Sequence, residues 1–102
     1  MREGPSSRVA AVAGTAEIQL PETPSSGYRW HLDDPRGEIT TVSTTYLDTS
    51  ATPIAGGTGV RVFQIRLDLT GRTEKDLTFL LRRPWEAPEQ AIERRVVTVT
   101  AG

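Results

Sequence analysis

Short runs of alternating apolar and polar residues, separated by turn-forming residues, constrain this chain more than any other feature of its sequence. In the clearest run, residues 60–69, the side chains of Phe63, Ile65, Leu67 and Leu69 alternate with polar ones. Such alternation places successive side chains on opposite faces of a half-buried strand, whereas a helix needs apolar residues three and four positions apart. We find no convincing helical spacing anywhere in the chain. The pattern therefore predicts an all-β fold.

Similar runs at intervals of roughly ten residues predict about seven short strands, which is typical of a two-sheet sandwich. The strands are expected at 8–13, 15–20, 28–32, 40–46, 60–69, 76–82 and 90–100. The length of 102 residues fits one domain, which we place at 8–102 after a flexible tail at residues 1–7. The inward-facing positions predict one core, made of Ile18, Leu20, Tyr28, Trp30, Phe63, Ile65, Leu67, Leu69, Leu77, Phe79, Leu81, Val97 and Val99.

The segment 20–30, Leu-Pro-Glu-Thr-Pro-Ser-Ser-Gly-Tyr-Arg-Trp, joins the second expected strand to the third. Pro24 fixes its own φ and pushes Thr23 into extended backbone, while Gly27 can take a positive φ at little cost. The pattern predicts a stiff, exposed loop, which loses little entropy when it binds a partner. Two further connections, 48–59 and 83–89, are expected to emerge at the same end of the sandwich.

Composition excludes several classes of function. The charge is nearly balanced, with 12 basic and 13 acidic residues, which argues against nucleic acid or an anionic membrane as the partner. No apolar run approaches the roughly 20 residues that span a bilayer. The chain has no cysteine, so thiol catalysis and thiolate metal sites are excluded. Residues 1–7 lack the apolar segment of a signal peptide, so we expect a cytoplasmic protein or a mature exported one.

Little in the sequence supports an enzyme, a metal site or a cofactor. His31 is the only histidine and is interpreted as a surface residue, so no nucleophile–base pair can be assembled. The carboxylate pairs Asp33–Asp34 and Glu86–Glu89 lie in turns, where solvation explains them. The run Gly56-Gly57-Thr58-Gly59 lacks the following Lys and Ser or Thr of a phosphate-binding loop.

The two tryptophans have different expected roles. Trp30 alternates with Tyr28 and Leu32 and is expected in the core. Trp85 follows Pro84 in a polar loop, so it is either a contact residue for a partner or a lid over the open end of the sandwich. The neighbouring Arg82 is either part of an outer-face charge pair or another contact residue.

Three motifs together resemble the chagasin-like inhibitors of papain-type cysteine peptidases. They are the segment 20–30, the segment 54–59 (Ile-Ala-Gly-Gly-Thr-Gly) with the strand after it, and the segment 81–86 (Leu-Arg-Arg-Pro-Trp-Glu). They occur in the order of the family, and the resemblance runs from about residue 12 to the C-terminus. It implies an immunoglobulin-like sandwich that inhibits papain-like peptidases reversibly and competitively, as a monomer.

In that family the loop corresponding to 23–27 enters the catalytic cleft and covers the active-site cysteine, and the other two loops grip its sides. We expect Ser25 and Ser26 to offer hydroxyls to the polar catalytic centre of the peptidase. The resemblance implies that the peptidase-binding residues are Thr23, Pro24, Ser25, Ser26, Gly27, Tyr28, Ala55, Gly56, Gly57, Thr58, Gly59, Arg83, Pro84 and Trp85.

The central motif departs from that of the family, which reads Asn-Pro-Thr-Thr-Gly where this chain has Thr-Pro-Ser-Ser-Gly. Thr23 lacks the amide donor of Asn, and Ser25 and Ser26 each lack a methyl group that would stiffen the side chain. This difference implies weaker inhibition or a different target peptidase. The alternative hypothesis is a non-inhibitory, immunoglobulin-like binding module that kept the loops as structural features.

Overall fold

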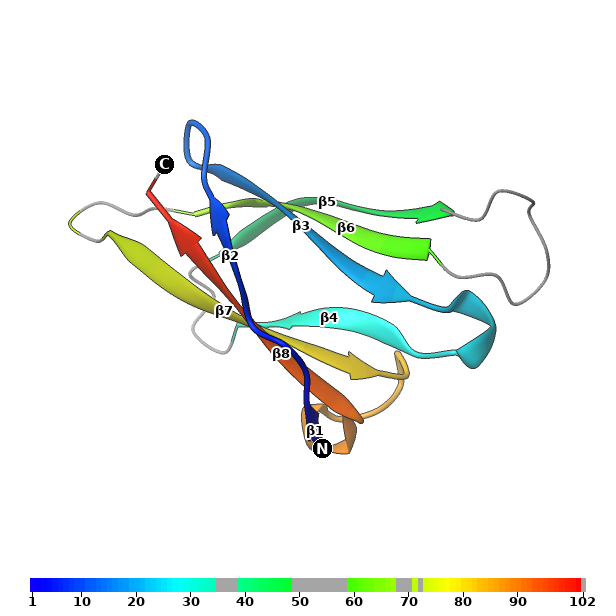
Figure 1. Ribbon diagram of the computed structural model, residues 1–102. Helices are drawn as coiled ribbons and strands as arrows, with labels where there is room; N and C mark the ends of the chain where they lie inside the picture. Colours follow the sequence, from blue (N-terminus) through cyan, green and yellow to red (C-terminus); the bar gives the residue numbers. More distant parts are fainter. Residues whose placement is uncertain (35–38, 49–58, 68–70, 72, 102) are drawn as a thin grey trace.

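The computed structural model describes residues 1–34, 39–48, 59–67, 71 and 73–101. Two β-sheets form two layers of a sandwich (Figure 1). The strands are β1 (Arg2–Glu3), β2 (Ser7–Ala10), β3 (Thr15–Glu22), β4 (Arg29–Asp33), β5 (Thr40–Asp48), β6 (Gly59–Arg66), β7 (Glu74–Arg82) and β8 (Glu93–Thr100). Two single turns of 3-10 helix, η1 (Pro24–Ser26) and η2 (Pro88–Gln90), lie in the connections. The predicted all-β, two-sheet sandwich is confirmed.

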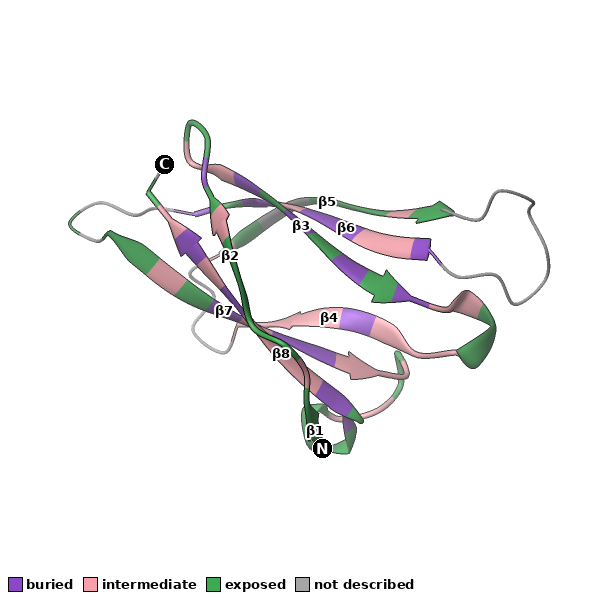
Figure 2. Ribbon diagram, viewed as in Figure 1, coloured by how far each residue is buried: buried purple, intermediate pink, exposed green. Residues whose placement is uncertain are grey.

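The larger sheet has the order β1-β8-β7-β4, and β2 also pairs with β8. The smaller sheet has the order β3-β6-β5 and is antiparallel throughout. Along β3, buried and exposed residues alternate at almost every position, as period-two patterning requires (Figure 2). Pro21 is tolerated in β3 because this edge strand needs its backbone donors on one side only.

The core lies between the sheets and joins them through large side chains. Phe63 of β6 and Phe79 of β7 meet across the interface with ring centroids 5.0 Å apart. Of the predicted core residues, ten are buried: Ile18, Leu20, Trp30, Phe63, Ile65, Leu67, Leu77, Phe79, Val97 and Val99. Leu81 is half-buried against this cluster, and Leu69 lies outside the described residues.

Tyr28 is a correction to the predicted core. The sequence pattern assigned it to the same strand face as Trp30, but β4 begins one residue later, at Arg29. Tyr28 belongs to the preceding loop and is only half-buried. The alternation fails here because Gly27, with a φ of 80°, redirects the chain immediately before Tyr28.

The N-terminal segment also differs from expectation. Residues 1–7 were predicted to be a flexible tail, but β1 and the first residue of β2 pair in parallel with β8. Ion pairs also join β1 to β8: Arg2 pairs with Glu93, and Arg94 Nε lies 2.8 Å from Glu3 Oε1. A segment of small and polar residues is therefore ordered by backbone pairing and charge rather than by apolar burial.

Strand register brings two loops and the described ends of β5 and β6 to one end of the sandwich. Glu22 at the end of β3 is the register partner of Gly59 at the start of β6. Arg29 at the start of β4 is the partner of Arg82 at the end of β7. Consequently the loop after β3, the strand ends that flank residues 49–58, and the loop after β7 are neighbours. Within the described residues, no helix is long and apolar enough to cross a membrane.

Candidate functional site

The loop between β3 and β4, residues 23–28, is a single 3-10 turn closed by its own backbone. The Ser26 amide donates to the Thr23 carbonyl at 3.1 Å, and the Gly27 amide donates to the Pro24 carbonyl at 3.1 Å. Pro24 stands at the start of the turn, where its fixed φ suits a helical conformation. Gly27 ends the turn in the left-handed region that glycine adopts without strain. This confirms the prediction that Gly27 adopts a positive φ.

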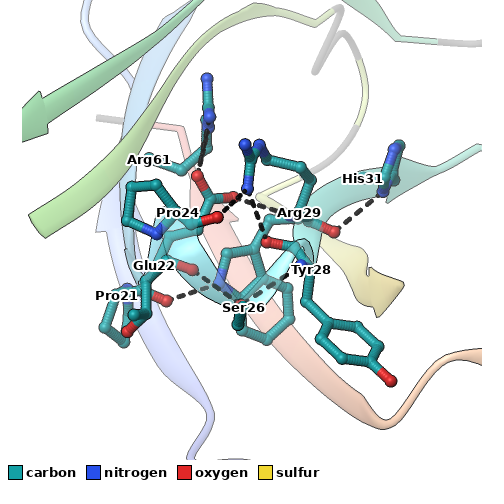
Figure 3. A network of polar contacts seen from close by, with 10 residues as sticks. Pro21, Glu22, Pro24, Ser26, Tyr28, Arg29, His31 and Arg61 are labelled. Carbon is teal, nitrogen blue, oxygen red and sulfur yellow. Dashed lines mark hydrogen bonds and ion pairs between the residues drawn. The ribbon is translucent and has the colours of Figure 1, made fainter. Parts of the chain in front are cut away.

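The Ser26 hydroxyl also takes part in holding this loop. It donates to the Thr23 carbonyl at 2.7 Å and accepts a hydrogen bond from the Tyr28 amide at 3.2 Å. The hydroxyl therefore bridges the two ends of the turn (Figure 3). Ser25 is exposed. Of the two serines that were expected to offer hydroxyls to a partner, Ser26 already uses its hydroxyl inside the loop.

A buried carboxylate anchors the base of the loop. Glu22, 4% exposed, accepts a hydrogen bond from the Trp30 amide at 3.0 Å, and its other oxygen lies 2.7 Å from Arg61 Nη2. The indole nitrogen of Trp30 donates to the Pro21 carbonyl at 2.7 Å, so both ends of the loop are tied together. A buried charge is tolerated when it is paired and hydrogen-bonded in this way.

Arg29 supports the same loop from β4. Its Nη1 donates to the carbonyl of Pro24 at 3.3 Å and to that of Tyr28 at 3.2 Å (Figure 3). Sequence reasoning did not single out Glu22, Arg29 or Arg61. The available signal was parity, because Glu22 continues the inward-facing series of Ile18 and Leu20 along β3.

The loop after β7 is fixed by a similar device. The Arg83 amide donates to Glu86 Oε1 at 2.7 Å, and the Glu86 amide donates to the Arg83 carbonyl at 3.0 Å. Arg82 Nη1 donates to the carbonyls of Glu86 at 2.8 Å and Pro84 at 3.4 Å. Arg82 thus shapes this loop, and among the described residues it has no carboxylate partner.

Trp85 projects from the tightened loop with 78% of its surface exposed. The lid alternative required the indole to fold over the open end of the sandwich, and this degree of exposure contradicts it. An apolar side chain this large, held on a fixed turn in solvent, is typical of a contact residue for a partner protein.

Arg83 brings the two loops together. Its guanidinium lies over the ring of Tyr28, 4.8 Å from the centroid, in a cation–π contact. Tyr28, Arg83, Pro84 and Trp85, which were predicted as site residues, therefore lie on adjoining loops. This contact joins the two loops directly.

The glycine-rich segment can be described only at its end. Ala55, Gly56, Gly57 and Thr58 lie outside the described residues. Gly59 is buried at the start of β6, and a Cβ at this position would collide with the Leu47 carbonyl and the Tyr46 ring. The glycine at 59 is thus required by packing between β5 and β6.

His31 is half-buried rather than a free surface histidine. Its Nδ1 lies 2.9 Å from the Arg29 carbonyl, so this nitrogen carries the proton that is donated. Burial lowers the pKa of His31, and the positive charge of Arg82 lowers it further. In the part of the chain that the structure describes, no three His, Asp or Glu side chains gather closely enough to hold a metal ion.

Comparison with known proteins shows the class to which this protein belongs. Residues 9–99 match the sequence model of the family described as Chagasin family peptidase inhibitor I42. The match covers most of the chain, so the protein belongs to the chagasin family of peptidase inhibitors and is not an enzyme.

Two particular proteins are similar to this chain. Chagasin from Trypanosoma cruzi is 29% identical over 96 residues, covering 89% of this chain and 84% of chagasin. The crystal structure of the cysteine protease inhibitor EhICP2 from Entamoeba histolytica has a TM-score of 0.62 with 18% sequence identity. That alignment covers 97% of this chain and 100% of EhICP2. The structural likeness concerns the fold, and the family assignment comes from the sequence.

Proposed function

We propose that the protein inhibits papain-like cysteine peptidases reversibly and competitively, with the loop 23–28 entering the catalytic cleft. The observation that carries the proposal is the preorganisation of this loop. Its backbone bonds, the Ser26 bridge and the supports from Glu22 and Arg29 hold one conformation before any partner arrives. Little conformational entropy is then lost on binding, which favours affinity.

The proposal assigns different roles to the parts of the edge. The held backbone of Pro24 and Gly27 keeps the loop from reaching the geometry that nucleophilic attack needs. Ser25 presents a hydroxyl at the tip, and Trp85 supplies apolar contact area beside the loop. An interface of standard size, about 1,600 Å² in total, suffices for tight binding when its loops are preorganised.

The test is an inhibition constant measured against a papain-like peptidase, for the parent and for Trp85→Ala. We expect competitive inhibition, and we expect Trp85→Ala to weaken it about thirtyfold, which corresponds to about 2 kcal/mol. The exposed indole has few internal contacts to lose, so the melting temperature should change little.

The matched control is Val12→Ala. Val12 is 76% exposed and precedes β3, at the end of the sandwich opposite to the proposed binding edge. Val12→Ala should leave inhibition unchanged. A loss of inhibition in Trp85→Ala can then be attributed to the position of Trp85 at the proposed binding edge rather than to the removal of exposed apolar surface in general.

A folded parent that inhibits no papain-like peptidase would contradict the proposal. It would favour the non-inhibitory binding module, which the departures from the family motif at Thr23, Ser25 and Ser26 keep as the second candidate. Inhibition that survives Trp85→Ala unchanged would contradict the role assigned to the indole.

A further inference from the structure

An arginine-lined hollow of about 460 Å³ lies between the sheets, behind the proposed binding edge. One wall comes from β4 and the end of β7, and the other comes from β5 and β6. Three arginines line it, Arg29, Arg61 and Arg82. Trp30, Leu32 and Phe63 supply apolar parts of the lining.

The positive charges in this hollow are poorly balanced. Arg61 is paired with Glu22, but the hydrogen bonds of Arg29 and Arg82 to described residues go to neutral carbonyls. Within the described residues, neither of these two arginines has a carboxylate within ion-pair distance. Arg29 and Arg82 are also direct register partners on β4 and β7, and like charges directly opposite in a sheet repel one another.

Arg82 shows the imbalance at one atom. Its Nε is buried and has no hydrogen-bond partner among the described residues. A buried donor without an acceptor is unfavourable, and such a group in a native fold calls for an explanation. His31 lines the same hollow, and the positive charges of Arg82 and Arg61 both lower its pKa.

We propose that this hollow binds one small oxoanion, of the phosphate or carboxylate class, toward which the Arg82 side chain turns so that its Nε donates a hydrogen bond, and which offsets the repulsion between Arg29 and Arg82. The planar fork of a guanidinium matches the spacing of two oxygens on such an anion, which a spherical halide lacks. The apolar lining reduces competition from water. The site does not depend on peptidase inhibition, so it can be tested on the free protein.

The direct test is a titration of the ¹⁵N-labelled protein with inorganic phosphate, followed by NMR. Sodium chloride is adjusted to hold the ionic strength at about 0.15 M, where the Debye length is about 8 Å. We expect saturable shifts of the Arg82 Nε–H signal and of the backbone amides of residues 29–32 and 61–63. Shifts that fail to saturate, or that are as large at Arg8 and Arg94 as at Arg82, would overturn the proposal.

Variants separate the site from a general salt effect. Arg82→Lys keeps the positive charge but removes the Nε donor, so phosphate should bind at least fivefold more weakly. Arg8→Lys is the control, because Arg8 is exposed and pairs with Glu74 at 2.5 Å, away from the hollow; its phosphate affinity should equal that of the parent. Should Arg82→Lys fail to fold, Arg29→Gln tests the neighbouring strand of the same wall, with the same weakening expected. A folded variant of either kind that binds phosphate as tightly as the parent would overturn the site.

Discussion

The Ser26 hydroxyl bridges both ends of the central loop, while the neighbouring Ser25 is exposed. Ser26→Ala should remove both hydrogen bonds and weaken inhibition about tenfold, since each exposed hydrogen bond contributes on the order of 1 kcal/mol or less. Ser26→Thr retains the hydroxyl and adds the methyl group that stiffens the side chain, so it should inhibit at least as well as the parent. Inhibition constants for the two variants against one papain-like peptidase provide the comparison. Equal inhibition by Ser26→Ala and the parent would show that the bridge does not matter for binding.

Glu22 is the residue on which the base of the loop depends. Glu22→Ala leaves Arg61, whose side chain is 17% exposed, without its partner, and removes the acceptor of the Trp30 amide. Breaking a buried ion pair from one side costs about 3–5 kcal/mol, and the partial exposure of Arg61 places our expectation near 3 kcal/mol in the free energy of unfolding.

Urea denaturation measures this loss. The control is Glu17→Ala, on the same strand, where an exposed side chain accepts one hydrogen bond from Gln64 at 2.8 Å. We expect that control to change stability by less than about 0.5 kcal/mol. If Glu22→Ala and Glu17→Ala lower the free energy of unfolding by similar amounts, the buried position of Glu22 does not add to its contribution to stability.

At the level of elements, alternation located the strands because one face of each is buried. It failed where backbone geometry or pairing, rather than burial, sets the structure. Tyr28 was misplaced because the left-handed Gly27 redirects the chain and β4 begins only at Arg29, and β1 was missed because Arg2 and Glu3 carry no apolar signal.

The candidate site also has a part that could be predicted from the sequence and a part that could not. The order of the strands predicted that 23–27 and 83–89 would be neighbours, and the register places them so. Parity along β3 could have placed Glu22 inward. The supports from Arg29, Arg61 and Arg82 could not be predicted, because charged residues in isolation are usually solvated. Their partners are backbone carbonyls and a carboxylate whose positions follow only from the fold.

The central loop yields a prediction about the backbone alone. Gly27 has a φ of 80° with open space around a hypothetical Cβ, so Gly27→Val strains the backbone without a steric clash from neighbours. We expect the loop to change conformation and inhibition to weaken at least tenfold, as about 1–3 kcal/mol of strain is relieved. Pro24→Gly should weaken inhibition by about 1 kcal/mol through added loop entropy.

Gly71→Val is the matched control for Gly27→Val. Gly71 has a φ of 76° and equally open surroundings, and it lies before β7, at the opposite end from the loops. Its effect should appear in the melting temperature and not in the inhibition constant. If Gly27→Val and Pro24→Gly both inhibit as well as the parent, the loop does not enter the cleft.

At the level of the whole molecule, β1 is held to β8 by ion pairs, one between Glu3 and Arg94 and the other between Arg2 and the carboxylate of Glu93. This carboxylate is 2% exposed and bonds to Arg2 and to Arg95, whose Nε lies 2.6 Å away. Burial by itself raises the pKa of Glu93, but the hydrogen bonds and charges of the two arginines outweigh it and lower the pKa below its ordinary value of 4.5.

A lowered pKa in the folded state means that ionised Glu93 stabilises the protein above pH 4.5. This contribution should be lost progressively as the pH falls from 4.5 through the lower folded pKa. Melting curves between about pH 7 and pH 3 should therefore show a steeper fall in stability for the parent than for Glu93→Gln. Glu74→Gln, which alters the exposed pair with Arg8, should keep the slope of the parent. Parallel curves for Glu93→Gln and the parent would contradict the linkage.

The way the central loop is tethered bears on whether it can be transplanted. Most of the hydrogen bonds that hold it lie within the ten residues from Pro21 to Trp30. They are the bond from the Trp30 indole to the Pro21 carbonyl, the Ser26 bridge and the bond from Arg29 to the Pro24 carbonyl. Among the described residues, the distant contacts are the Arg61 partner of Glu22 and the cation–π contact of Arg83 with Tyr28. A graft onto the hairpin of another protein should keep its shape when this whole segment moves together with one inward-facing arginine on the adjoining strand. The five residues of the turn alone would arrive without most of the bonds that shape them.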